Sequence, residues 1–163
     1  MDLLGKHKIS LANVRSMAIQ CYALDVAAFP LLQGGTHTDR GGKTKEAYEE
    51  LFTAQLLAFA IALRTKFYQG LDHKTTVRYI QAAGFLFKNN SCGEKTLAFS
   101  IKDVCDKIIH ADTISRYLEL GISKPSTSFC GKDSRDNSTW ECAISVTLFV
   151  EGVLEWLQDV EEA

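Results

Sequence analysis

Four polar side chains between positions 103 and 110 have the types and the spacing for acid–base chemistry. Asp103, Asp106, Lys107 and His110 recur at i, i+3, i+4 and i+7, so on an α-helix they form one polar stripe. An imidazole with a lysine and carboxylates on its stripe suits the cleavage of a phosphodiester. One group would take the proton of a ribose 2′-hydroxyl, and a cation would stabilise the charge that develops on phosphorus.

Each of these residues also has a simpler interpretation. A lone histidine near the C-terminal end of a helix is commonly a solvent-exposed residue, because the helix dipole favours a cation there. Asp103, Asp106 and Lys107 could form surface ion pairs, each adding only a few tenths of a kcal/mol. For Asp103 we favour the ion pair.

The helix that must position this stripe is predicted over Glu94 to Asp112. Ser91, with Glu94 three residues later, matches a capping box at its start. The apolar residues of the segment recur with the period of one helix face, almost opposite the polar stripe. They are Leu97, Ile101, Val104, Cys105, Ile108 and Ile109. The core is therefore expected on one side and the chemistry on the other.

Three earlier segments are also predicted to be helical. The first runs from about Ser10 to Ala28, because Pro30 and the following glycines should end it. The second, Lys45 to about Tyr68, begins with acidic residues, ends with basic ones and is apolar nearly all round, so we expect it at the centre. The third is Lys74 to Phe87.

The chain after Asp112 has a different pattern. Short apolar segments at Ser128 to Cys130 and Thr139 to Cys142 flank a polar turn and predict a β-hairpin. A final amphipathic helix is expected from Ala143 to Val160. Residues 1–163 should thus form one mainly α domain, a four- to five-helix bundle with a short β-hairpin before the C-terminal helix.

Composition and charge exclude several classes. A formal net charge of −2 and a pI near 6.1 do not predict nonspecific nucleic-acid binding through a basic stripe. The longest apolar run, Leu51 to Leu63, is too short to cross a bilayer, so we expect no membrane association. Five cysteines, with no secretory leader recognised, favour reduced thiols and a cytoplasmic location, although a Cys130–Cys142 disulfide is geometrically feasible.

No cofactor or metal ion is predicted. The loop from Gln33 to Thr44 contains four glycines and the letters GKT, but His37 stands where a phosphate-binding loop requires glycine. His37, His73, His110 and Asp112 lack the spacing of a metal site.

The run DVCDKIIHA, from Asp103 to Ala111, is followed by a hairpin with a GK turn, a Trp-Glu pair and a terminal amphipathic helix. Over about Ile101 to Leu157 this pattern resembles small members of the HEPN superfamily, helical bundles among bacterial toxins and antiviral defence proteins. The resemblance implies a homodimeric, metal-independent ribonuclease that acts on RNA, with a partner protein encoded nearby. It implies that His110 is the acid–base residue.

The family's arginine, expected with four to six residues between it and the histidine, is absent: Asp103, Val104 and Cys105 occupy those positions. Lys107, Asp106 and Arg116 are the remaining candidates for the site, with Arg116 supplying charge from the next segment. Lysine cannot form the planar fork of arginine. Three functions therefore stay open: a ribonuclease or ribonuclease-derived toxin, a noncatalytic interaction module such as an accessory or antitoxin-like subunit, and a small-molecule sensor that uses the loop Gln33 to Thr44.

Overall fold

The computed structural model describes residues 9–32, 42–69, 83–89, 94–96, 99–117, 125–133 and 138–162. In chain order, its elements are α1 (Leu11–Leu32), α2 (Lys43–Tyr68), β1 (Gly84–Asn89), β2 (Glu94–Thr96), α3 (Ile101–Ile109), β3 (Thr113–Tyr117), β4 (Ser126–Lys132), β5 (Thr139–Ser145) and α4 (Val146–Glu162). The mainly helical class is confirmed. The hairpin before the last helix is also confirmed, because β4 and β5 pair antiparallel and α4 follows β5 directly.

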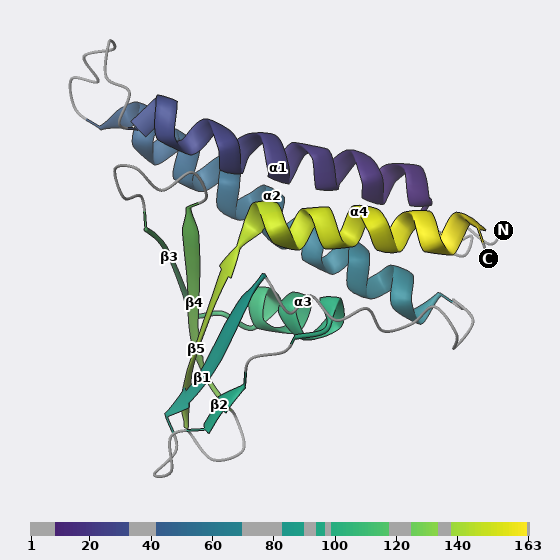
Figure 1. The fold of residues 1–163 in the computed structure, drawn as a ribbon. Coiled ribbons are helices and arrows are strands. Elements are labelled where there is room, and N and C mark those ends of the chain that lie inside the picture. Colours follow the sequence, from purple (N-terminus) through teal and green to yellow (C-terminus); the bar gives the residue numbers. More distant parts are fainter. Residues whose placement is uncertain are drawn as a thin grey trace, which may run out of the picture.

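Three long helices form one layer, and the sheet stands against it (Figure 1). α1 packs against both α2 and α4, and α2 packs against α3. The short helix α3 lies in the angle between the long helices and the sheet (Figure 1). This arrangement places the end of α3 and the strand that follows it beside α2.

The hairpin is the centre of a larger sheet that the sequence did not reveal. The described strands are all antiparallel and follow the order β2-β1-β5-β4-β3. The predicted helix from Lys74 to Phe87 is wrong over its last four residues, because Gly84 to Phe87 belong to β1. β1 pairs with β5 along its whole length, so cross-strand pairing outweighs local helical periodicity here. Residues 74–82 lie outside the described residues.

α3 begins later than the sequence predicted. Glu94 lies in β2, so the expected capping box with Ser91, itself outside the described residues, does not form. The helix starts instead after Ser100, whose Oγ accepts a hydrogen bond from the Asp103 N–H at 3.1 Å, while the Asp103 carboxylate accepts one from the Ser100 N–H at 3.0 Å. This reciprocal capping box fixes the start of the helix. Its end is at Ile109, with His110 as the C-cap.

The other helices differ from prediction only at their ends. α1 continues past Ala28 to Leu32 and accommodates Pro30 in its last turn. α4 starts at Val146 rather than Ala143, because residues 143–145 continue β5. The four described cysteines, Cys21, Cys105, Cys130 and Cys142, are free thiols.

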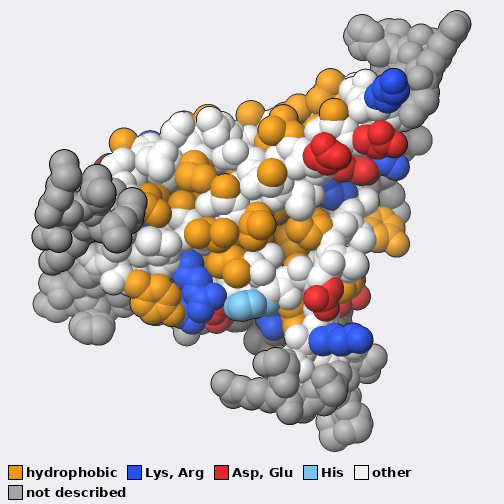
Figure 2. All heavy atoms as spheres, turned by 180° about the vertical axis from the view of Figure 1, so that it is seen from behind, with side chains coloured by type: hydrophobic (Ala, Val, Ile, Leu, Met, Phe, Trp, Pro, Cys, Tyr) orange, Lys and Arg blue, Asp and Glu red, His pale blue; other side chains and the backbone are white. Residues whose placement is uncertain are grey.

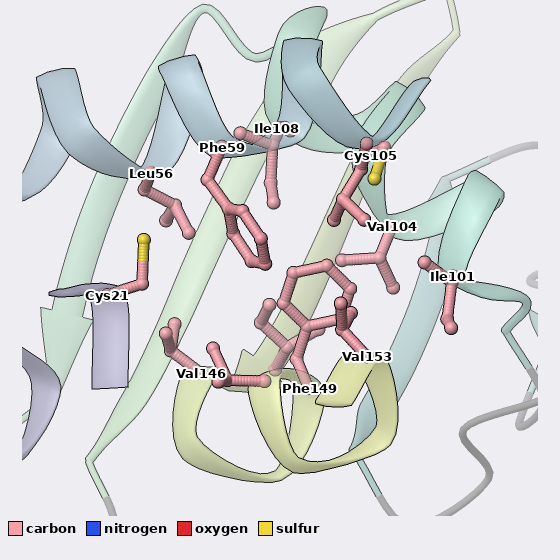
Figure 3. Close-up of a cluster of buried hydrophobic side chains, with 14 of the residues drawn as sticks. Cys21, Leu56, Phe59, Ile101, Val104, Cys105, Ile108, Val146, Phe149 and Val153 are labelled. Carbon is pink, nitrogen blue, oxygen red and sulfur yellow. The ribbon is translucent and has the colours of Figure 1, made fainter. Parts of the chain in front are cut away.

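The main core lies where α1, α2, α3 and α4 converge (Figure 3). Phe59 of α2 meets Phe149 of α4 edge to face, with 5.9 Å between ring centroids. The predicted apolar face of α3 supplies Ile101, Val104, Cys105 and Ile108, all buried. The polar stripe of the same helix is thereby turned away from the core.

Candidate functional site

The acidic and basic residues of the predicted stripe have structural partners. Asp103 completes the capping box of α3. The Asp106 carboxylate forms an ion pair with Arg64 of α2 at 2.7 Å and accepts a hydrogen bond from the Lys102 ammonium at 3.1 Å. Asp106 therefore helps to fasten α3 to α2.

Lys107 lies over an aromatic ring of the sheet. Its Nζ is 4.0 Å from the centroid of the buried Trp140 side chain, a cation–π contact. The Trp140 ring in turn covers Gly131, where an added Cβ would come within 2.3 Å of the ring. Glycine at this position lets the ring lie flat against β4.

His110 is exposed, as Asp103 is, but it differs from the other members of the set in its contacts. Its backbone N–H donates to the Asp106 carbonyl, and its side chain is exposed at the end of α3. Within the described part of the chain, the imidazole makes no hydrogen bond or ion pair. The structure thus leaves this ring accessible, while Asp106 and Lys107 take part in tertiary contacts.

Arg116 of β3 belongs to a different cluster. Its side chain is only 10% exposed and forms an ion pair with Asp25 of α1, which is fully buried. It also donates a hydrogen bond to the Tyr48 hydroxyl, and its guanidinium carbon lies 4.0 Å from the centroid of the Phe52 ring. The cluster of Asp25, Tyr48 and Arg116 joins the edge of the sheet to the first two helices.

Asp25 also holds the start of α4. Its second carboxylate oxygen accepts a hydrogen bond from the Thr147 N–H at 3.0 Å. Burial raises the pKa of Asp25, while the Arg116 charge and the Thr147 N–H act in the opposite direction. Burial likewise raises the pKa of Tyr48 to about 12. The predicted site did not include Asp25 or Tyr48.

One feature of the sequence indicates the cluster of Asp25, Tyr48 and Arg116. Asp25 shares the helix face of Val14, Ala18, Cys21 and Ala28, all of which are buried. A carboxylate on an otherwise apolar face implies a buried cation or donor, because an unpaired buried charge costs several kcal/mol.

A groove runs between α2 and β3. One part has a cavity volume of about 460 Å³ and is lined by Leu32, Lys45, Tyr48, Glu49, Thr53, Ile114, Ser115 and Arg116. The other has about 300 Å³ and is lined by Thr53, Leu57, Ile108, Ile109, Ala111, Asp112, Thr113 and Ile114. The two parts share Thr53 and Ile114 as lining residues and therefore adjoin; together they are hereafter the α2–β3 groove.

A second surface feature lies on the outer side of α2. Leu51, Ala54, Ala58 and Ile61 are all exposed and recur at intervals of three, four and three residues. We call these four residues the α2 stripe. Leu51 is 56% exposed and Ile61 48%. Figure 2 shows a band of hydrophobic side chains across one face of the molecule.

The described residues contain no group of three or more metal-ligating side chains. None of the described helices is long and apolar enough to cross a membrane. Comparisons with protein-family models, with curated proteins and with solved structures found no match to this chain. The resemblance to the HEPN superfamily therefore stays a prediction.

Proposed function

We propose that the protein is a noncatalytic interaction module that self-associates through the α2 stripe. The observation that carries this proposal is the exposure of Leu51 and Ile61 on a helix that is apolar on both its inner and its outer side. A helix that is apolar all round is normally buried all round. Contiguous exposed apolar surface of this kind marks interaction sites in soluble proteins.

The stripe is complementary to itself. If two copies of α2 pack antiparallel about a twofold axis between Ala54 and Ala58, Leu51 faces Ile61 of the second copy. The alanines then face each other, and small side chains let helices approach closely. A twofold interface requires such self-complementarity.

The proposal is tested with charged substitutions on the stripe. We expect Leu51→Glu and Ile61→Lys to abolish the dimer, weakening self-association by a factor of about a hundred or more, because each copy would bury an unpaired charge. Mixing the two variants should restore a heterodimer, because Glu at 51 would then face Lys at 61. Sedimentation velocity measures all three samples.

A matched control comes from α1. Ile19 is 55% exposed, nearly the same as Leu51, but lies on a different helix. Ile19→Glu should leave self-association unchanged. If Ile19→Glu is monomeric while Leu51→Glu and Ile61→Lys remain dimeric, the proposed surface is wrong. If the wild-type chain and all three variants are monomeric, the proposed self-association is wrong.

A ribonuclease is the second candidate function. The observation that favours it is the exposure of His110, whose two neighbours in the sequence, Ile109 and Ala111, line the α2–β3 groove, although His110 itself does not. If His110 transfers a proton in RNA cleavage, His110→Ala should reduce the rate by a factor of about a hundred or more. Equal rates for wild type and variant, measured in EDTA with fluorogenic single-stranded RNA, would exclude this role.

A further inference from the structure

β3 is an edge strand whose free side lies along the α2–β3 groove. It pairs with β4 on one side, and no described strand pairs with its other side. Figure 1 shows it at the outer side of the sheet, with the long helices above. An unpaired strand edge presents backbone N–H and C=O groups that can pair with another extended chain.

The residues that line the groove place it at this free edge. Side chains of a strand alternate between its two faces, and in β3 Ile114 and Arg116 are half-buried, whereas Thr113 and Ser115 are exposed. All four line the groove. A depression that touches residues of both faces must reach the strand at its edge, where the backbone is accessible.

The two ends of the groove differ chemically. Leu57, Ile108, Ile109 and Ala111 make one end apolar, with Asp112 beside them. The other end is polar: Lys45 and Glu49, which pair at 3.7 Å, line it together with Arg116, whose counter-charge is Asp25. A ligand with apolar side chains at one end and polar side chains at the other would match both.

We propose that the α2–β3 groove binds an extended segment of a partner polypeptide, which adds to β3 as a further strand. Backbone hydrogen bonds to the edge would supply affinity, and alternate apolar side chains would fill the end near Ile109. Polar side chains of the segment would lie near Lys45 and Glu49. This inference goes beyond the proposed self-association and does not rest on it, because the groove and the α2 stripe share no residue.

The test uses a synthetic library of seven-residue peptides. Positions 1, 3 and 5 carry valine, isoleucine, leucine or phenylalanine, and the other positions carry threonine. We expect saturable binding by fluorescence polarisation, with amide chemical-shift changes concentrated in residues 113–117. Methylation of alternate backbone nitrogens in the tightest peptide should weaken binding at least tenfold, because it removes strand pairing but keeps the side chains.

Variants locate the site. Thr53 lies on α2 and lines both parts of the groove, so Thr53→Trp should weaken peptide binding at least tenfold. The control variant Asn13→Trp, on the exposed side of α1, should leave the affinity unchanged. Circular dichroism checks that both variants fold. Repeating the titration with the Leu51→Glu variant separates this proposal from the self-association. The inference is overturned if no peptide binds saturably, if N-methylation has no effect, or if the shifts map elsewhere.

Discussion

Removing one partner of the buried ion pair between Arg116 and Asp25 should lower the free energy of unfolding more than most single substitutions do. Asp25→Asn keeps the shape of the side chain and an acceptor for the Thr147 N–H, but removes the charge that faces Arg116. Because Asp25 is fully buried and Arg116 is 10% exposed, the guanidinium would remain buried without a counter-charge. Breaking such a pair costs about 3–5 kcal/mol.

The assay is a double-mutant cycle in urea, followed by tryptophan fluorescence. Arg116→Met removes the cation and keeps much of the apolar stem against Phe52. The double variant Asp25→Asn/Arg116→Met buries no charge from the pair. Its loss of unfolding free energy should therefore be smaller, by about 2 kcal/mol, than the sum of the losses of the two single variants. For a chain of this size, the Asp25→Asn loss corresponds to a fall in Tm of roughly 2–4 °C per kcal/mol.

The pH dependence of the free energy of unfolding tests the same ion pair independently. Burial raises the pKa of Asp25, and Arg116 is the larger of the opposing influences, so Arg116→Met should raise this pKa further. A carboxyl group with a raised pKa in the folded state stabilises the fold at low pH, and this contribution is lost as the pH rises through the folded pKa. The free energy of unfolding of Arg116→Met should therefore decline, relative to wild type, as the pH rises above the folded-state pKa of Asp25 in the wild type, because below that pH Asp25 is protonated in both folded proteins. Additive single losses, or an Asp25→Asn loss below about 1 kcal/mol, would refute a buried, coupled pair.

Three further predictions concern local contacts. Ser100→Ala should cost about 1 kcal/mol in urea unfolding, because the reciprocal hydrogen bonds with Asp103 are lost, and no change would show that the capping box is not formed. Gly131→Ala should destabilise the protein and shift its tryptophan emission, because a Cβ would come within 2.3 Å of the Trp140 ring; unchanged emission would contradict this packing. In the native state, the half-buried Cys130 should react with Ellman's reagent faster than the three buried cysteines, because burial raises the pKa of their thiols. Equal reaction rates would contradict the burial of those three. These thiols are Cys21, Cys105 and Cys142.

The helices were predictable where their periodicity was long and their ends were marked. α2 was predicted from Lys45 to about Tyr68 by its apolar residues and the charges at its ends, and the apolar face of α3 by spacing. The sheet was not predictable to the same degree, because β1 depends on pairing with β5 more than fifty residues later. Local sequence carries little information about such long-range pairing.

The surroundings of the predicted site residues were predictable only in part, for a similar reason. His110 lies at the surface at the end of a helix, as the spacing predicted. The partners of the other residues come from distant segments: Arg64 of α2 for Asp106, Trp140 of β5 for Lys107, and α1 for Arg116. Spacing along one helix identifies which residues share a face, but not what another element places against them.

Sedimentation equilibrium of the wild-type chain over a range of concentrations is the most direct test of the proposed self-association. One chain has a mass of 18.1 kDa. We expect the mass to approach twice this value as the concentration rises, and to stay at the single-chain value for Leu51→Glu. A wild-type chain that remains monomeric at the highest concentration would contradict the account.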